Sequence, residues 1–323
     1  MTAISLQFSS HIRRLDVQRD LLETADLIEL CFGSQMDPDG HAYLRNIRRA
    51  ARSNDHLRWL PGPNEQATYP LFGYVWEEDQ RLIGNVSLIP ILHANSWRYL
   101  IANVAVHPDY RGRGIGHELT RRALRHIREQ GVKLACLQVR DSAPVAYHLY
   151  LSQGFQERAR RTTWVCDPLK VIPKIQPDGG IKILPRPAHN WSSQAEWLQT
   201  LYPPEVNWNL LYNQHRLGPG LWQKFVNLAT GALVRHWAAF RQGSLQGILS
   251  WEPTHLYADN LWLAVPLGQE DDDAVLALLA TAREELSTIR PLSVNLPVGV
   301  ATPALENAGF IQQNTLIWME KYV

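Results

Sequence analysis

The chain has 323 residues, of which 45% are hydrophobic and 20% are charged, as in an ordinary globular protein of about two domains. Its formal net charge is +1 and neither end carries a charged tail, so the charge indicates neither a nucleic acid nor a membrane as a partner. Three cysteines at unrelated spacings argue against a disulfide framework or a zinc ribbon, and no apolar run has the length of a signal peptide or a membrane span, so we expect a cytoplasmic protein with reduced thiols.

The first half of the chain predicts a mixed layer of helices and strands. Apolar residues spaced by three and four indicate helices, and short alternating or continuous apolar runs indicate strands. In chain order we expect a strand in 6–16, helices in 17–33 and 40–53, a hairpin in 71–92 with its turn at 77–80, a strand in 97–108, a helix in 114–131, a strand in 133–140, a helix in 142–154 and a strand pair or hairpin in 155–167. Strands on both sides of one long amphipathic helix predict the α+β class.

The last helix of this half carries signals at both ends. Ser142 is a candidate N-cap, Pro144 falls in the first turn, and Gly154 follows the last turn. Asp141 is interpreted as a helix cap rather than as a catalytic base.

The second half repeats the order of the first. Prolines and a Gly-Gly pair in 167–180 predict a linker, so we expect domains at 1–167 and 181–323 with a linker at 168–180. A hairpin, a strand, a helix, and a final helix and strand then follow, in 234–253, 260–268, 274–288 and 301–321. Because the order is the same, the chain predicts an internal duplication into two tandem domains.

The stretch VAVHPDYRGRGIG, residues 104–116, predicts a phosphate-binding site. Gly112, Gly114 and Gly116 follow an apolar strand and open a helix. The first amides of a helix lack intrahelical partners, and the helix dipole favours an anion there. Glycine lets the backbone approach the anion, and Arg111 and Arg113 add charge that suits phosphate oxygens. We therefore expect this loop to bind a diphosphate or a phosphorylated cofactor.

This stretch differs from two common phosphate loops and resembles a third. The dinucleotide-binding fingerprint G-x-G-x-x-G needs a third glycine where this chain has His117. The chain also lacks the GK[ST] sequence of a P-loop. RGRGIG, residues 111–116, instead resembles the R/Q-x-x-G-x-G/A loop of the GCN5-related N-acetyltransferases, the GNAT family. The preceding VAVHP strand, the long helix, and the LYxxxGF motif at 149–155 also resemble that family. The resemblance covers roughly residues 5–166.

The resemblance implies tandem GNAT folds and an acetyl-CoA-dependent N-acetyltransferase that uses no metal. In this family the loop amides hold the pyrophosphate, the preceding strand binds the pantetheine, and an amine attacks the thioester between two splayed strands. The tyrosine that protonates the leaving thiolate corresponds to Tyr150, for which core packing is the alternative. The implied cofactor-binding residues are Val104, Ala105, Val106, Arg111, Gly112, Arg113, Gly114, Ile115, Gly116, His117, Ser142 and Ala143.

The chain departs from the family at two positions. Ala143 takes the place of an Asn that often contacts the cofactor, so this contact is lost or is supplied by Ser142. Gln138 takes the place of a Glu that often acts as the base, and Gln cannot accept a proton. Residues 77–78, both Glu, are interpreted as a solvated turn, so the identity of the base stays open, with ordered water as an alternative.

Other reactive side chains have ordinary interpretations. No cluster of His and carboxylates has the spacing of a metal site. Cys136 lies in an apolar strand and is interpreted as core rather than as a nucleophile. His117 either contacts phosphate or is solvated. The arginines of the long helix are interpreted as a solvated face, with the adenosine phosphate of the cofactor as the alternative; they are Arg121, Arg122, Arg125 and Arg128.

The second half lacks the loop. It has PLGQEDDDAV in its place, and the acids from Glu270 to Asp273 would repel a pyrophosphate. Leu305 takes the place of Tyr150. We expect a degenerate copy that has lost CoA binding and that shapes the acceptor pocket or stabilises the first domain. Its many tryptophans indicate a substrate cleft, an interface or a large core.

The expected reaction is acetyl transfer to a primary amine of a small molecule or a peptide, and fold analogy does not identify the acceptor. Two other classes stay as alternatives. A non-catalytic acyl-CoA sensor is supported by Gln138 and Ala143, and an interaction module is the second alternative.

Overall fold

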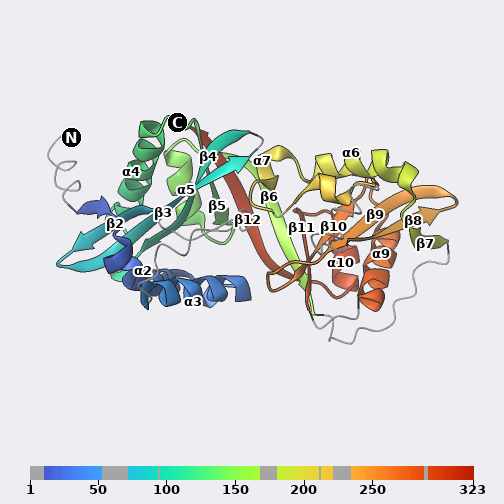
Figure 1. Ribbon diagram of the computed structural model, residues 1–323, viewed down its shortest axis with the longest axis horizontal. Helices are drawn as coiled ribbons and strands as arrows, with labels where there is room; N and C mark the ends of the chain where they lie inside the picture. Colours follow the sequence, from blue (N-terminus) through green and yellow to red (C-terminus); the bar gives the residue numbers. More distant parts are fainter. Residues whose placement is uncertain are drawn as a thin grey trace. The chain divides into compact units, whose positions relative to one another are not determined.

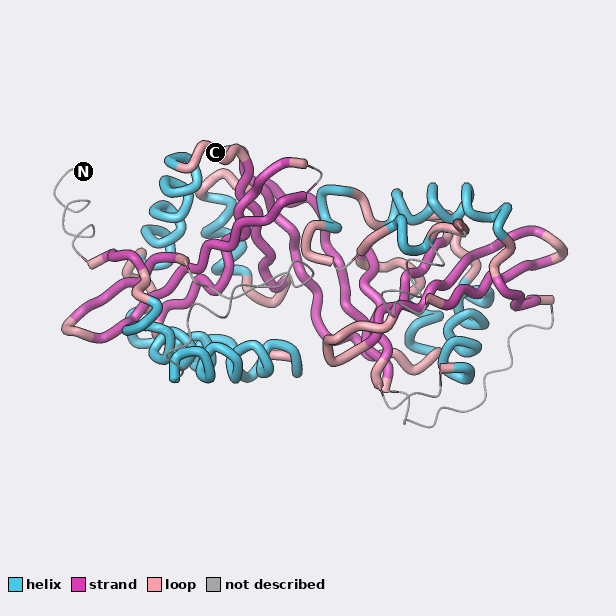
Figure 2. Tube along the Cα trace, in the orientation of Figure 1, coloured by secondary structure: helices cyan, strands magenta, loops and turns pink. Residues whose placement is uncertain are grey.

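The computed structural model of the chain describes residues 11–52, 72–93, 95–167, 180–210, 212–220, 234–286 and 290–323. Packing divides the chain into two compact units, which Figures 1 and 2 show with their helices and strands. The first unit runs to Glu157 and also includes Trp318–Val323, and the second unit is Arg158–Ile317. Each unit is described by itself.

The first unit is built on a mixed sheet. Its strands, in spatial order, are β1 (Ile12–Arg14), β2 (Gly73–Glu78), β3 (Arg81–His93), β4 (Ser96–Val106), β5 (Leu134–Arg140) and the end of β12 (Ile311–Tyr322). Neighbours from β1 to β4 are antiparallel, and β4 runs parallel to β5. The mixed α+β class is confirmed, and so are the strands expected in 71–92, 97–108 and 133–140. Of the strand expected in 6–16, residues 12–14 form β1, and residues 6–10 lie outside the described residues.

The turn between β2 and β3 is shorter than the sequence predicted. Only Asp79 and Gln80 connect the strands, and both have positive φ, at 50° and 62°. Two such residues form the tight turn that matches the twist of a hairpin. Glu77 and Glu78 therefore lie in the strand rather than in a solvated turn.

Helices cover both faces of this sheet. In Figure 1, α2 (Val17–Phe32) and α3 (Pro38–Arg52) lie on one face, and α4 (Ile115–Glu129) and α5 (Pro144–Ser152) lie on the other. The apolar stripe of α4 is buried, as its spacing predicted; its members are Ile115, Leu119, Ala123, Leu124 and Ile127. This arrangement places the beginning of α4 beside the end of β4.

Two local predictions at α5 and β6 are wrong. The N-cap of α5 is Ala143, whose side chain accepts no hydrogen bond, so neither Ser142 nor Asp141 caps this helix. Pro144 at the first position fixes the helical φ and lacks an amide at a place where it would have no partner within the helix. The expected strand pair in 155–167 is a single strand, β6 (Gln156–Cys166), because the segment contains no turn sequence to reverse it.

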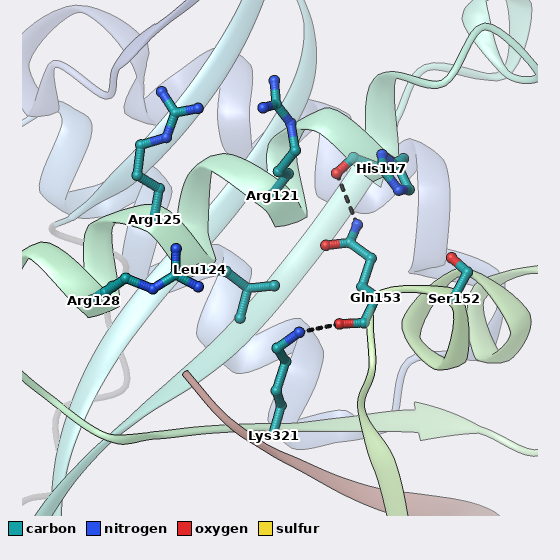
Figure 3. Close-up of a pocket in the computed structure, with 8 residues that line it drawn as sticks. All are labelled: His117, Arg121, Leu124, Arg125, Arg128, Ser152, Gln153 and Lys321. Carbon is teal, nitrogen blue, oxygen red and sulfur yellow. Dashed lines mark hydrogen bonds between the residues drawn. The ribbon is translucent and has the colours of Figure 1, made fainter.

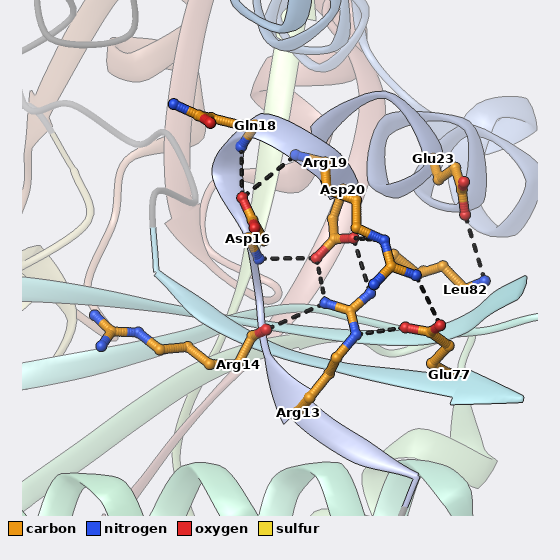
Figure 4. A network of polar contacts seen from close by, with 9 residues as sticks. All are labelled: Arg13, Arg14, Asp16, Gln18, Arg19, Asp20, Glu23, Glu77 and Leu82. Atoms are coloured by element: carbon orange, nitrogen blue, oxygen red, sulfur yellow. Dashed lines mark hydrogen bonds and ion pairs between the residues drawn. The ribbon is translucent and has the colours of Figure 1, made fainter. Parts of the chain in front are cut away.

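A network of ion pairs joins β1, β2 and the first turn of α2 (Figure 4). Arg13 donates to both oxygens of Asp20, at 2.6 and 2.9 Å, and also to Glu77. Arg19 donates to Glu77 at 2.7 Å, and the amide of Asp16 donates to Asp20 at 2.8 Å. Burial raises the pKa of Asp20, but these hydrogen bonds outweigh burial and hold the pKa below its usual value. Both carboxylates are therefore structural ion-pair partners.

The second unit repeats this architecture. Its strands, in spatial order, are β6, β11 (Leu292–Pro297), β10 (Asp259–Ala264), β9 (Ser244–Glu252), β8 (Arg235–Arg241) and β7 (Ile181–Pro185), with the first part of β12 beside β6. In Figure 1, α6 (Trp191–Leu201) lies on one face, and α9 (Asp272–Glu285) and α10 (Thr302–Asn307) lie on the other. The hairpin, the strand, the helix, and the final helix and strand follow in the predicted order, so the tandem fold is confirmed. The strand β11 lies between the two helices and was not predicted.

Tryptophans of the second unit lie mainly in its core. Trp208, Trp237, Trp251 and Trp262 are each at most 8% exposed. Trp237, Trp251 and Trp262 belong to the core cluster around β8, β9 and β10, so the core interpretation of the aromatic enrichment holds for these three residues. The expected linker at 168–180 stays a prediction, because residues 168–179 lie outside the described residues.

Candidate active site

The loop before α4 forms an open cradle of backbone amides. A 3-10 turn, η2 (Pro108–Tyr110), follows β4, and Gly112 and Gly114 then have φ of 78° and 79°. Gly114 is the N-cap of α4 and has no side chain to satisfy the first amides of the helix. An added Cβ at either glycine would meet no atom within 4 Å, so the space in front of these amides is open. Such a helix start attracts an anion.

Gly116 has a different role from the other two glycines. Its backbone is helical, and an added Cβ would lie 3.3 Å from Cδ1 of Leu149. This glycine therefore lets the first turn of α4 approach α5, the helix of the LYxxxGF motif. Ile115 points into the core, at 2% exposure, so it can offer a ligand only its backbone.

The basic residues of the loop are partly engaged. Nε of Arg111 donates to the carbonyl of Val106 at 3.2 Å. Arg113 lies over the ring of Tyr110, 4.7 Å from its centroid, and 3.8 Å from Glu78. Both arginines are exposed, so their remaining N–H groups are open to an anionic ligand.

Strands β4 and β5 separate beside this loop. Their parallel pairing joins Tyr99 to Ala135 and Leu100 to Cys136, and no later residue of β4 has a partner in β5 among the described pairs. Residues 104–106 thus lie along a gap, with Ala105 buried and Val104 and Val106 half-buried. A strand edge inside a gap can bind an extended ligand through its backbone groups.

A bulge in β4 lies at the same gap. Ser87 of β3 faces Ala102 and Asn85 faces Ala105, so β4 contains one extra residue between these pairs. Asn103 has φ of 50°, a strained conformation for a residue with a side chain. Asn103 and Val104 have no partner in the β3 register, so the amides of these two residues do not take part in the β3–β4 ladder.

A polar cluster supports this bulge from the side of α3. Nδ2 of Asn85 donates to the carbonyl of Asn103 at 2.9 Å, and Nδ2 of Asn103 donates to Oη of Tyr43 at 2.8 Å. Asn85 and Ser87 are both fully buried, and Oδ1 of Asn85 has no hydrogen-bond partner among the described residues. Sequence reasoning missed these residues; the signal was a polar residue inside each apolar run of β3 and β4.

Tyr150 lies in α5 with only 7% of its surface exposed. Its ring packs edge-to-face on Phe155, with centroids 5.9 Å apart. Burial raises the pKa of Tyr150, so the hydroxyl stays protonated at neutral pH. The described part of the chain makes no hydrogen bond to its hydroxyl, which leaves its proton free to meet a ligand. Ser142, which is exposed, and Ala143, which is half-buried, directly precede this helix.

No described side chain is assigned as the base. Cys136 is fully buried, donates to the carbonyl of Tyr99 at 3.4 Å, and has a pKa raised by burial, so it is a core residue as predicted. Glu77 is held by Arg13 and Arg19, and these arginines lower its pKa. Within the described ranges, no three His, Cys, Asp or Glu side chains lie close enough together to hold a metal ion.

A cavity of about 380 Å³ opens along the exposed face of α4 (Figure 3). It is lined by His117, Arg121, Leu124, Arg125, Arg128, Ser152, Gln153 and Lys321. Gln153 donates to the carbonyl of His117 at 2.8 Å, and Lys321 donates to the carbonyl of Gln153. The cavity thus begins at the phosphate loop and continues along the helix. Sequence reasoning named the arginines but missed Gln153 and Lys321.

The corresponding helix start in the second unit is closed by side chains. Asp271 caps α9 and accepts the amide of Ala274 at 3.1 Å, while Glu270 accepts the amide of Gly268 at 2.8 Å. Arg241 donates to Asp271 at 2.6 Å. The carboxylate of Asp271 therefore satisfies an amide of the helix start, where Gly114 of the first unit has no side chain to do so. Leu305, at the place of Tyr150, is fully buried and offers no proton.

Comparisons with known proteins agree with this geometry. Residues 41–155 match the family described as the Acetyltransferase (GNAT) family. The chain is similar to the mycothiol acetyltransferase of Thermobifida fusca, 42% identical over 53 residues, which are 16% of each chain. It is also similar to the [Ribosomal protein bS18]-alanine N-acetyltransferase of Escherichia coli K12, 37% identical over 62 residues, which are 19% of this chain and 42% of that protein. The matched segments thus span less than half of either relative.

A solved structure shows the same fold over nearly the whole chain. The GCN5-related N-acetyltransferase of Sphaerobacter thermophilus has a TM-score of 0.58 at 16% identity, and the match covers 97% of this chain and 96% of that one. Among the described helices, none is both long and apolar enough to cross a membrane. The loop, the separated strands and the matched segment lie in one unit, and residues 41–155 are a domain of the GNAT family of acetyltransferases.

Proposed function

We propose that the first unit is an N-acetyltransferase that takes the acetyl group from acetyl-CoA and transfers it to a primary amine. The observation that carries this proposal is the uncapped start of α4 behind two glycines of positive φ, beside a gap between β4 and β5. The residues present fit the cofactor, because a side chain at Gly112 or Gly114 would fill the space that a pyrophosphate needs.

Each part of the site has a proposed task in binding. Amides of residues 112–117 hold the pyrophosphate, and Arg111 and Arg113 add positive charge. Backbone groups of residues 104–106 bind the pantetheine along the edge of β4. Gly116 keeps α5 close, so that Tyr150 lies beside the thioester. Ser142 and Ala143 border the cofactor at the start of α5.

The chemistry divides between the bulge and Tyr150. The amine nitrogen forms a bond to the acetyl carbonyl carbon, the bond from this carbon to sulfur breaks, and the nitrogen loses a proton to water. The free amides of the β4 bulge stabilise the negative charge on the carbonyl oxygen. Tyr150 gives its proton to the leaving thiolate and regains one from solvent, a role that its buried, protonated hydroxyl suits.

We infer that the second unit holds no cofactor. Its helix start is filled by Glu270 and Asp271, and like charges repel the phosphates. The proposed stoichiometry is therefore one acetyl-CoA for each chain.

A thiol-release assay tests the activity. The full chain is incubated with acetyl-CoA and a panel of primary amines, which includes small amines, peptides with a free N-terminus and lysine peptides, and free CoA is measured with a thiol reagent. We expect at least one class of amine to raise CoA release and to gain the mass of an acetyl group. Tight acetyl-CoA binding without release on any amine would favour a sensor instead.

A further inference from the structure

A second cavity, of about 270 Å³, is lined entirely by residues of the second unit. Its wall is formed by the first half of β6, the end of α6, the short helix α7 (Pro204–Asn207) and the end of β11. This volume suits a small metabolite rather than a ligand of the size of CoA. The wall contains two arginines, one glutamate and several apolar side chains, so it offers both signs of charge to one small ligand.

Arg161 is a buried cation of this wall, and no carboxylate of the described residues pairs with it. The residue is 1% exposed. Its guanidinium donates to Oδ1 and the carbonyl of Asn295, at 2.6 and 2.9 Å, and to the carbonyl of Leu201 at 2.7 Å. The ring of Tyr202 lies 5.1 Å from its Cζ. Burial lowers the pKa of Arg161 to about 10, so the side chain stays charged at neutral pH among neutral partners.

The buried charge of Arg161 can be neutralised by an anion in the cavity. A buried charge is costly unless an opposite charge meets it. The hydrogen bonds of Arg161 use three of its N–H groups, and each Nη retains one more. A carboxylate in the cavity can accept these N–H groups and supply the missing negative charge. Arg158, which also lines the cavity, adds a second positive charge.

Glu205 adds the opposite charge to the same wall. It lies in α7, is exposed, and has no ion-pair partner in the described part of the chain. Arg161 and Glu205 thus line one cavity without pairing with each other. Apolar groups complete the wall; among them are Leu201, Val206 and Pro297.

We propose that this cavity binds a free α-amino acid with an aliphatic side chain. Its carboxylate contacts Arg161, its ammonium group contacts Glu205, and its side chain packs on Val206 and Pro297. A free amino acid carries both charges on one carbon beside the apolar group, whereas a residue at either end of a peptide retains only one of these charges. The site lies in the second unit and does not depend on the proposed acetyl-CoA site of the first.

Calorimetric titration of the full chain with L-valine, L-leucine and L-isoleucine tests this site. L-Leucinamide lacks the carboxylate and 4-methylpentanoate lacks the ammonium group, so each is a matched ligand for L-leucine. We expect each of the three amino acids to bind one equivalent. L-Leucine should bind about tenfold more tightly than either matched ligand, because each of these loses one hydrogen-bonded charge.

Glu205→Gln tests the contact with the ammonium group. The affinity for L-leucine should fall about tenfold, and the affinity for 4-methylpentanoate should be unchanged, because that ligand has no ammonium group to lose a partner. Glu306→Gln, an exposed glutamate of α10 outside the cavity, is the matched control and keeps both affinities.

Arg161→Lys tests the contact with the carboxylate. Lysine keeps the positive charge but loses the planar set of donors, so the affinity for L-leucine should fall about tenfold while that for L-leucinamide stays the same. Thermal unfolding of both variants shows whether the fold is kept. If Arg161→Lys does not fold, Glu205→Gln alone decides the test.

Three results would overturn the amino-acid site. They are the absence of binding by all three amino acids at millimolar concentration, equal affinities for L-leucine and its two matched ligands, and a Glu205→Gln variant that binds L-leucine as tightly as the wild type. Gly114→Val changes the proposed acetyl-CoA site and should bind L-leucine as the wild type does, so the two proposals can fail independently.

Discussion

The side-chain amide of Asn85 donates a hydrogen bond of 2.9 Å to the carbonyl of Asn103, the residue of positive φ at the bulge of β4. Asn85 is fully buried, so this contact is shielded from water and strong for its kind. A left-handed residue with a side chain is strained, and surrounding contacts must hold it. Asn85 therefore supports the backbone that faces the gap between β4 and β5.

Asn85→Leu tests whether this support serves the reaction. The substitution keeps the volume but removes the donor to Asn103, so the bulge relaxes and its amides no longer meet the acetyl carbonyl. Because these amides are proposed to bind the acetyl carbonyl, the wild type is expected to bind acetyl-CoA more tightly than CoA. In the variant we expect this preference to disappear and the rate of transfer to fall about tenfold or more, while CoA affinity stays within about twofold. Titrations with both ligands and the thiol-release assay measure these quantities.

Thr24→Val is the control for Asn85→Leu. It removes another fully buried polar group of the first unit, whose hydroxyl has no hydrogen-bond partner in the described structure. The control keeps the preference for acetyl-CoA. If Asn85→Leu lowers stability but keeps both the preference and the rate, Asn85 is only a structural residue.

Tyr150→Phe separates an enzyme from a sensor. The variant keeps the ring packing on Phe155 and loses only the hydroxyl, so acetyl-CoA affinity stays the same while the rate falls about 100-fold, within the range for general acid catalysis.

Tyr147→Phe on the same helix is the matched variant. It loses a hydrogen bond of 2.9 Å to Glu157 and is expected to keep the rate. Equal rates for Tyr150→Phe and the wild type would show that Tyr150 is a packing residue and that another group protonates the thiolate.

Asp20→Asn tests the ion-pair network of β1 and α2. The pKa of Asp20 lies below its usual value of 3.8, so its contribution to stability is present above about pH 4 and is lost as the pH falls through the lowered pKa. At pH 7 the variant should lose about 2 kcal/mol of unfolding free energy. The substitution removes one of the two carboxylates that pair with Arg13, and only Glu77 remains. Urea unfolding at pH 7 and pH 3 measures both effects.

Glu29→Gln provides the comparison for Asp20→Asn. Glu29 pairs with Arg48 but is 45% exposed, so its loss costs about 0.5 kcal/mol or less. If the wild type and Asp20→Asn lose the same free energy of unfolding between pH 7 and pH 3, the ionised Asp20 does not stabilise the fold, and the account is contradicted.

The sequence was most informative where one local rule decides the structure. The long helix over 114–131, the glycine loop before it and the order of strands follow from apolar spacing and from the position of Gly112 and Gly114. The predicted start of α5 was wrong because two local preferences conflict there. Ser142 is a good capping residue, but Pro144 shifts the helix start to Ala143.

Contacts between distant segments could not be predicted from the sequence. Asn85 and Asn103 lie on different strands, and only the register of β3 and β4 brings them together. Lys321 reaches the cavity of the first unit because the end of β12 belongs to that unit, although its sequence lies in the second half. Tertiary pairing, which no local pattern encodes, places these residues.

Calorimetric titration of the full chain with acetyl-CoA, beside Gly114→Val, tests the central claim most directly. The wild type should bind one equivalent, and Gly114→Val should bind none, because valine disfavours the φ of 79° and fills the phosphate space. Gly131→Val is the matched control, since Gly131 has φ of 69° at the other end of α4, and it should still bind one equivalent. No binding by the wild type, two equivalents, or undiminished binding by Gly114→Val would contradict a single cofactor site at this loop.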